Sequence, residues 1–308
     1  MTNIDPQLEV RSGFLPVGVD HQLYFEDIGD ITLEPLLFLH GGPGLGCEEK
    51  HRTQFDLKKY RVILLNQRGS GRSQTQGELN DNSTQLIVKD IETLRKRLKL
   101  EKFSLIGSSW GAVPATLYAA ENPDRINTLL LKSPFLARRK DFLWGYSSQG
   151  VAQQLQWDWE QFSLKGRFQG STLVQQYYSA LVHAEAPKKE RAAWACRWIN
   201  WEGAQYFYNR PHEKIDLTPE TITPYWMNVA RIQIHYAKNN YFLDETGIMP
   251  SLEKLAATNI KGFCLQGGKD IITPASELEE VKAIWPSLEI KILPEADHKI
   301  PEEELLKL

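Results

Sequence analysis

The chain has 308 residues, of which 42% are hydrophobic and 24% are charged, and its formal net charge is −3. This length suits one large α/β domain with an insertion, or two small domains. A net charge this close to zero gives no indication of nucleic acid or an anionic membrane surface as a partner, and we expect neither.

Cysteine usage and the start of the chain favour the cytoplasm. Cys47, Cys196 and Cys264 are widely spaced and odd in number, which fits neither a metal site nor a disulfide framework and suits a reducing compartment. The first six residues lack the basic and apolar regions of a signal peptide, and no apolar run approaches membrane-spanning length. We therefore expect a cytoplasmic protein without a bound metal.

Strand patterns dominate the first 132 residues. Residues 8–17 and 21–26 are typical of an antiparallel pair joined by a turn. Short apolar runs typical of buried strands follow at 35–40, 61–66, 103–106 and 126–132. Residues 83–100 have helical spacing, with one apolar stripe. Strands that alternate with helices predict an α/β protein, in which a mostly parallel sheet has helices on both faces.

The pattern changes after Phe135. Residues 136–247 are polar, aromatic and helical in character, with no clear strand. Strand patterns resume at 261–266 and 288–293, with a helical stretch between them. We therefore expect a core domain made of residues 1–135 and 248–308, with a helical cap domain of residues 136–247 inserted into it.

A candidate nucleophile lies between the strand at 103–106 and an alanine-rich helical stretch at 112–120. The intervening Gly107–Gly111, GSSWG, fits G-x-S-x-G, the nucleophile elbow that turns a strand sharply into a helix and lifts one serine above the sheet. The pattern selects Ser109. Because a glycine–serine turn after a strand is often only a turn, the assignment depends on partners elsewhere in the chain.

A serine hydroxyl needs a base to take its proton and an acid to hold that base in the right tautomer. In α/β-hydrolases these groups follow strands, in the order serine, acid, histidine. Asp270 and His298 each come shortly after a predicted strand, in that order. Asp297 is a competing acid, but its adjacency to His298 makes the geometry of a triad awkward. We predict that Ser109, Asp270 and His298 form a catalytic triad.

Four motifs resemble those of the proline iminopeptidase (prolyl aminopeptidase) family of α/β-hydrolases. They occur in that family's order: His40–Gly44 (HGGPG), Asn66–Ser73 (NQRGSGRS), Gly107–Gly111 (GSSWG) and Trp198–Gly203 (WINWEG). The resemblance extends from about Leu8 to His298. It implies the α/β-hydrolase fold with a helical cap, the triad above, and an oxyanion hole made by the peptide N–H groups of Gly42 and Trp110.

The main departure from the family pattern concerns the residues that bind the substrate amine. Residues 230–236 (ARIQIHY) look like the family's A-R-I-E-x-H-Y, with Gln233 in place of glutamate. In the family, that glutamate and the glutamate of W-E-G bind the free amine of the substrate, and Glu202 matches only the second. Gln233 can accept a hydrogen bond through its amide oxygen but carries no charge. Asn66 also departs, since the family has aspartate there, while Arg68 is expected to brace its loop.

We predict a serine hydrolase that releases an N-terminal residue, preferably proline, from small peptides or amides through an acyl-enzyme, without a cofactor. The alternative is an esterase or amidase of the same fold with relaxed selectivity for a free amine. A non-catalytic binding protein on this scaffold ranks behind both, because it would predict a damaged triad and all three residues are present. The sequence leaves the oligomeric state open.

Overall fold

The structure, a computed structural model, describes residues 9–182 and 187–306. Leu8, the predicted first residue of the first strand, lies outside the described residues, as does the chain start on which the signal-peptide prediction depends. No helix in the described part of the chain is long and apolar enough to cross a membrane.

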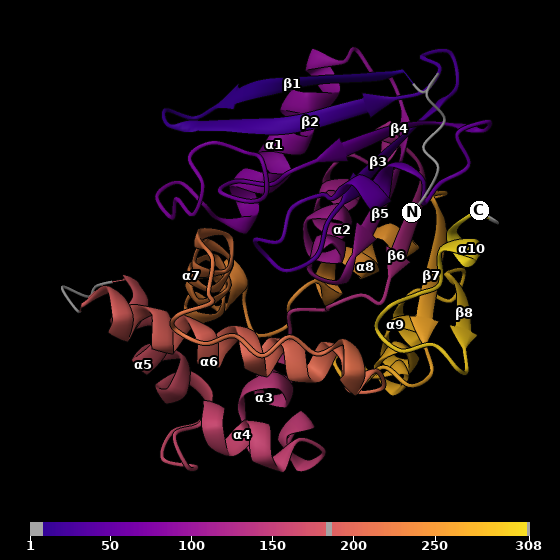
Figure 1. Ribbon diagram of the computed structural model, residues 1–308. Coiled ribbons are helices and arrows are strands. Elements are labelled where there is room, and N and C mark those ends of the chain that lie inside the picture. Colours follow the sequence, from indigo (N-terminus) through magenta and orange to yellow (C-terminus); the bar gives the residue numbers. More distant parts are fainter. Residues whose placement is uncertain (1–8, 183–186, 307–308) are drawn as a thin grey trace.

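An eight-stranded sheet runs through the molecule in the order β1-β2-β4-β3-β5-β6-β7-β8 (Figure 1). Its strands are β1 (Val10–Val17), β2 (His21–Ile28), β3 (Glu34–Leu39), β4 (Tyr60–Leu65), β5 (Phe103–Ser108), β6 (Ile126–Lys132), β7 (Lys261–Gly267) and β8 (Glu289–Leu293). β2 is antiparallel to both β1 and β4, and every pair from β4 to β8 is parallel. The predicted mostly parallel sheet is confirmed.

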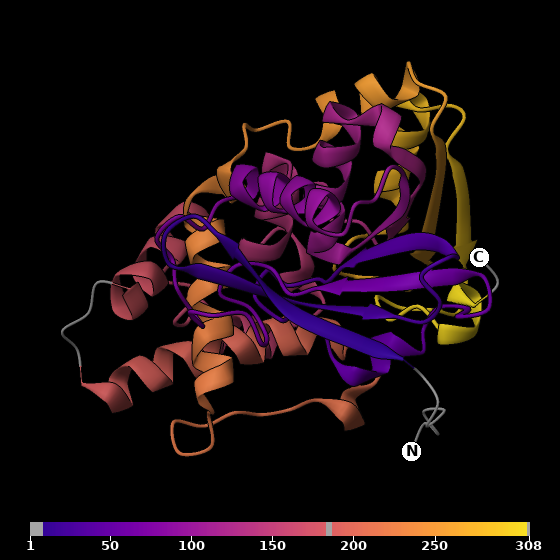
Figure 2. The same cartoon turned by 90° about the horizontal axis from the view of Figure 1, so that it is seen from above.

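Side chains alternate between the two faces of this sheet and form two apolar clusters. In β4, Ile63 and Leu65 belong to the larger cluster, and Val62 and Leu64 to the smaller one. The larger cluster includes residues of α1 (Thr84–Arg97), α2 (Ala112–Glu121), α8 (Met249–Ala256) and α9 (Leu278–Ile284). The smaller one is covered by α10 (Glu302–Leu305) and by the loop after β3. Both faces are covered, as predicted, but α1 and α2 share one side of the strands (Figure 2) and the other side carries only short elements.

Helices fill the chain between β6 and α8. They are α3 (Arg139–Tyr146), α4 (Gln156–Phe162), α5 (Gly170–Val182), α6 (Lys188–Tyr206) and α7 (Pro224–Lys238), and no strand occurs in the described part of this segment. They lie across the edge of the sheet at which the parallel strands end (Figure 1). The limits of the predicted cap domain, 136 and 247, stay a prediction.

Buried aromatic rings hold these helices together. Phe162 stacks on Trp201 with 5.2 Å between ring centroids, and on Tyr177 with 4.9 Å. Trp198 packs against both Phe162 and Tyr177. Trp198 and Trp201 are 0% and 1% exposed, so the two tryptophans of the WINWEG segment belong to the apolar core of the helical layer. Their packing fixes the direction in which the glutamate next to them points.

Candidate active site

Ser109 lies at the turn between β5 and α2. Its φ angle is 54°, in the left-handed region that non-glycine residues rarely adopt. The flanking glycines make this turn possible: a Cβ on Gly107 would lie 2.5 Å from the carbonyl oxygen of Gly111, and one on Gly111 would overlap the carbonyl oxygen of Leu39 in β3. The elbow is therefore built by close backbone contacts, and it holds one strained serine at the edge of the sheet.

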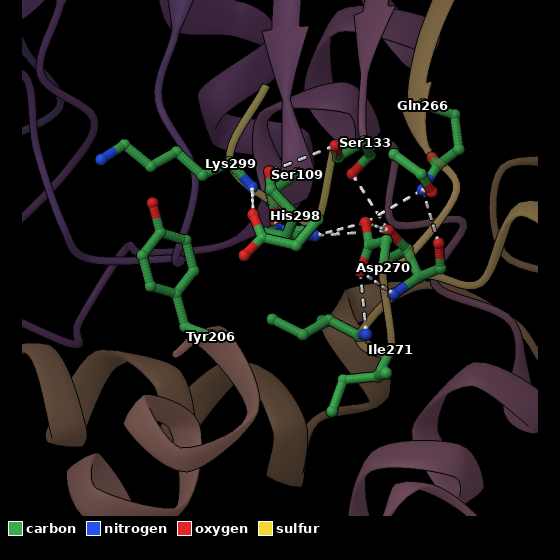
Figure 3. Close-up of polar contacts among 12 residues, drawn as sticks. Ser109, Ser133, Tyr206, Gln266, Asp270, Ile271, His298 and Lys299 are labelled. Carbon is green, nitrogen blue, oxygen red and sulfur yellow. Dashed lines mark hydrogen bonds and ion pairs between the residues drawn. The ribbon is translucent and has the colours of Figure 1, made fainter. Parts of the chain in front are cut away.

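The loops after β5, β7 and β8 bring together the three residues predicted to form the triad (Figure 3). The Ser109 hydroxyl lies 2.9 Å from Nε2 of His298, and Nδ1 of His298 lies 2.8 Å from Oδ2 of Asp270. If Nδ1 carries the ring proton and donates a hydrogen bond to Asp270, Nε2 is free to accept the proton of the serine. This is the geometry that general-base activation of a hydroxyl requires.

Asp270 is held as a carboxylate by several donors. Its Oδ1 accepts hydrogen bonds from the peptide nitrogens of Ile272 and Thr273, and its Oδ2 accepts from the Thr273 hydroxyl and the Gln266 amide. Burial acts to raise the pKa of Asp270, but the charge of His298 and the hydrogen bonds from His298 and Thr273 outweigh it, so the pKa lies below its ordinary value. The side chain can therefore orient His298 and stabilise its protonated form.

Asp297, the competing acid, points elsewhere. Its Oδ2 accepts a hydrogen bond from Nε of Arg210 at 2.9 Å, and its Oδ1 accepts from the peptide nitrogen of Lys299 at 2.8 Å. The structure brings Asp270, and not Asp297, into contact with the imidazole.

The glycine loop after β3 faces the elbow. A Cβ on Gly41 would lie 3.2 Å from Cβ of Ser109, and Gly42 has a φ angle of 121°, so the loop follows a path that only glycine accepts. Gly42 and Trp110 line the same cavity as Ser109. Their role as oxyanion donors stays a prediction.

A network that the sequence analysis missed fixes this loop against the elbow. Gln67 donates from its side-chain amide to the carbonyl of His40, and its amide oxygen accepts from Nε1 of Trp110 at 2.9 Å. The peptide nitrogen of Gln67 donates to Nε2 of His40, whose pKa burial lowers to about 4, so the imidazole is neutral at ordinary pH. The NQRG motif was the available signal, but nothing in it indicates which partners Gln67 has.

Other residues of the NQRGSGRS segment have structural contacts. Arg68 forms a bidentate ion pair with Asp90, at 2.6 and 2.7 Å, both side chains being buried. This contact supports the expectation that Arg68 braces its loop. The Asn66 amide oxygen accepts from the peptide nitrogen of Cys47 at 2.9 Å. An amide oxygen can take that role as well as a carboxylate, so the departure at Asn66 has a local explanation.

The cavity above Ser109 has a volume of about 830 Å³ and lies between the sheet edge and the helical layer. Glu202 of α6 and Gln233 of α7 both line it, together with aromatic side chains. The Tyr146 hydroxyl donates to Glu202 at 3.2 Å. Burial raises the pKa of Glu202 to about 7, against the opposing effects of Tyr146 and His298. The carboxyl of Glu202 therefore lies in the cavity beside Tyr146.

The amide oxygen of Gln233 has a partner that was not anticipated. It accepts a hydrogen bond from Nε1 of Trp198 at 2.8 Å. Because an indole N–H can only donate, this contact sets the orientation of the amide. The amide nitrogen of Gln233 has no hydrogen-bond partner among the described residues, so the side chain offers the cavity a donor, where an ammonium group would require an acceptor. No group of three or more His, Cys, Asp or Glu side chains that could hold a metal ion occurs in the described part of the chain.

Comparison with known proteins identifies the family to which the chain belongs. Residues 34–305 match the family described as alpha/beta hydrolase fold. A proline iminopeptidase of Arabidopsis thaliana is 34% identical over 94% of this chain and 76% of its own length. A proline iminopeptidase of Xanthomonas citri is 32% identical over 96% of this chain and 92% of its own length.

Solved structures share the fold at lower identity. A proline iminopeptidase-related protein from Thermus thermophilus aligns with a TM-score of 0.56 and 22% identity, over 94% of this chain and 91% of that one. The thioesterase domain from the curacin biosynthetic pathway aligns with a TM-score of 0.58 and 17% identity, over 94% of each chain. The sequence matches, at 32–34% identity over most of both chains, show that the chain belongs to the proline iminopeptidase family, and the solved structures share its α/β-hydrolase fold.

Proposed function

We propose that the protein is a serine aminopeptidase that releases N-terminal proline from small peptides or amides. The observation that carries this proposal is that Ser109 and His298, with Asp270 hydrogen-bonded behind the imidazole, line the same cavity as the carboxyl of Glu202. Family membership supports the same conclusion, since the relatives at 30% identity or more include proteins named proline iminopeptidase.

The reaction follows from the geometry of the triad. His298 Nε2 takes the proton of Ser109 as Oγ attacks the carbonyl carbon of the N-terminal residue. The peptide N–H groups of Gly42 and Trp110 stabilise the oxyanion, and each such donor is typically worth about 3–4 kcal/mol. When the intermediate collapses, His298 returns the proton to the leaving amine and the prolyl group stays on Ser109 as an ester. A water molecule that gives its proton to His298 then attacks the ester and releases proline.

The amine of the substrate would meet the carboxyl of Glu202. An ammonium group close to this side chain favours its ionised form, which burial alone disfavours. The aromatic rings of Tyr146, Tyr241 and Phe135 line the cavity and provide apolar surface for a pyrrolidine ring. Substrate and carboxylate thus each compensate for the cost of burying the other.

A second candidate function is an esterase or amidase with relaxed selectivity for a free amine. The contact between Trp198 and Gln233 favours it, because it occupies the amide oxygen that would otherwise face an ammonium group. A panel that contains prolyl anilide, alanyl anilide, N-acetylprolyl anilide and simple acyl esters separates the two. An aminopeptidase cleaves prolyl anilide fastest and the N-acetylated compound poorly, whereas an esterase shows the reverse order or prefers the simple esters.

We also propose that the protein works in the cytoplasm. The three cysteines are free and buried, and their Sγ atoms form no disulfide in the described chain. Such cysteine usage fits a reducing compartment.

A further inference from the structure

An unpaired lysine lies in the active-site cavity, on the sheet side of Ser109. Lys132 is the last residue of β6, and in the parallel register it is paired with Ser108, which precedes the nucleophile. Its side chain lines the cavity and has no hydrogen bond or ion pair within the described part of the chain. Burial, followed by the nearby charge of Lys50, lowers the pKa of Lys132 to about 8, so the ammonium group is still largely protonated at pH 7. Lys132 is half-buried, and a cation that is partly removed from water and has no partner is costly, so a site of this kind favours an anion.

A second donor lies beside it. The peptide nitrogen of Glu48 donates to Nδ1 of His51 at 2.7 Å, so the neutral ring carries its proton on Nε2. Burial lowers the pKa of His51 to about 4, with the charges of Lys50 and Lys132 acting in the same direction, and the ring is therefore neutral. His51 lines the cavity, and its Nε2 has no hydrogen-bond partner among the described residues.

The charges around Lys132 leave an excess of cations. Lys50 and Lys299 line this part of the cavity and add positive charge, and the Lys299 side chain extends away from Asp270 beyond His298 (Figure 3). Lys50 is ion-paired with Glu48 at 2.9 Å, and both side chains are more than half exposed. The charge of Glu302, at the start of α10, acts to raise the pKa of Lys132, but the two side chains form no ion pair.

The acidic and the basic groups that line the cavity come from different layers of the molecule. Glu202 belongs to the helical layer, whereas Lys132 and His51 belong to the sheet domain, and Ser109 lines the same cavity. Neighbouring strands lie about 4.8 Å apart, so the backbone of Lys132 is that close to the residue before the nucleophile. An extended residue spans about 3.5 Å. The first residue after the scissile bond, one residue length from Ser109, is therefore close enough to this region to carry an anion toward it.

We propose that Lys132 and His51 form a subsite for the α-carboxylate of the residue that leaves, so that dipeptides with a free C-terminus are the favoured substrates. This inference rests on the proposed aminopeptidase function and deepens it. The substrate, with its ammonium group at Glu202 and its carboxylate at Lys132, has a charge pattern complementary to that of the cavity. Lengthening the peptide moves the carboxylate out of the subsite, and amidation removes its charge.

The test compares kcat/KM for Pro-Gly, Pro-Gly-amide, Pro-Gly-Gly and Pro-Asp-amide, together with prolyl anilide. We expect Pro-Gly to exceed Pro-Gly-amide by about tenfold, which corresponds to about 1.4 kcal/mol. Pro-Gly-Gly and Pro-Asp-amide should resemble Pro-Gly-amide. In Lys132→Met the ratio of Pro-Gly to Pro-Gly-amide should fall to within about twofold of one, and Lys132→Arg should keep most of the preference. Lys89→Met, an exposed lysine of α1 that does not line the cavity, is the charge-matched control and should keep the wild-type ratio.

Four results are decisive against the subsite. The proposal is overturned if kcat/KM for Pro-Gly and for Pro-Gly-amide are nearly equal in the wild type. It is also overturned if Lys132→Met leaves the ratio of these two values unchanged. Equal rates for Pro-Asp-amide and Pro-Gly would show that a side-chain carboxylate serves as well as the α-carboxylate, and equal rates for Pro-Gly-Gly and Pro-Gly would show that position does not matter. Failure of the proposed function looks different, because then neither prolyl anilide nor any prolyl peptide is cleaved. Urea denaturation shows whether each variant is folded, and removal of the unpaired, half-buried charge of Lys132 should not lower the stability.

Discussion

The replacement Gln233→Glu gives the sharpest test of how the cavity recognises an amine. The amide oxygen of Gln233 accepts from Nε1 of Trp198, and a carboxylate at this position can keep that bond with one oxygen. The second oxygen then replaces the amide nitrogen, so an acceptor takes the place of a donor on the cavity wall shared with Glu202. An incoming ammonium group would meet two carboxylates in place of one carboxylate and one amide.

The size of the effect follows from the difference between charged and neutral hydrogen bonds. Bonds to charged groups contribute about 1.5–3 kcal/mol and neutral ones about 0.5–1.5 kcal/mol, so the substitution should gain on the order of 1–2 kcal/mol. This corresponds to roughly a tenfold increase in selection for a free amine. Because burial already raises the pKa of Glu202 to about 7 and a second carboxyl raises it further, the gain should be larger at pH 8 than at pH 6.5.

The assay measures kcat/KM for prolyl anilide and N-acetylprolyl anilide at both pH values. We expect the ratio of the two to rise about tenfold in Gln233→Glu and to fall in Glu202→Gln. Gln176→Glu makes the same chemical change at an exposed position of α5 and should leave the ratio unchanged. If Gln233→Glu also leaves it unchanged, the residue does not contact the amine, and the esterase function becomes the better supported one.

Three further predictions concern the base, the buried carboxyl and the elbow. His298→Ala should lower kcat/KM by several orders of magnitude, and Asp270→Ala should cost far more than Asp297→Ala; the opposite ranking would move the acid to Asp297. Because the pKa of Glu202 is raised in the folded state, its ionisation opposes folding, and this cost grows as the pH rises from 4.5 to about 7. Urea denaturation should therefore show Glu202→Gln to be more stable than the wild type by about 1–3 kcal/mol at pH 8 and by much less at pH 5, whereas an equal gain at both pH values would show that the pKa of Glu202 is not raised. Gly111→Ala should lose activity and stability together, because its Cβ overlaps backbone oxygens at the end of β3; retention of both would contradict the close packing of the elbow.

Local patterns predicted most of the fold. The helix predicted over 83–100 is observed as Thr84–Arg97, and the strand predicted over 288–293 as Glu289–Leu293. Both signals depend on the periodicity of neighbouring residues, which the sequence contains directly. The position of β4 between β2 and β3 could not be predicted in this way, because strand order is determined by contacts between segments far apart in the chain.

In the candidate site, too, local patterns could be predicted from the sequence and contacts between distant segments could not. The elbow is a five-residue pattern, and the order of Ser109, Asp270 and His298 along the chain restricts their possible arrangement, so these three could be proposed from the sequence. The hydrogen bond between Trp198 and Gln233 joins α6 to α7 across 35 residues, and no local pattern indicates it. The sequence therefore predicted that Gln233 lacks a charge but not which of its two polar atoms faces the cavity.

The central claim is that Ser109 attacks an N-terminal prolyl group and carries it as an ester. The most direct measurement follows proline release from prolyl anilide by the wild type and by Ser109→Ala, with a fluorophosphonate adduct mapped by peptide mass spectrometry in the same preparations. We predict turnover and an adduct on Ser109 in the wild type, and neither in Ser109→Ala. An adduct on Ser108, or substantial proline release by a folded Ser109→Ala protein, would contradict the assignment of the nucleophile and with it the mechanism.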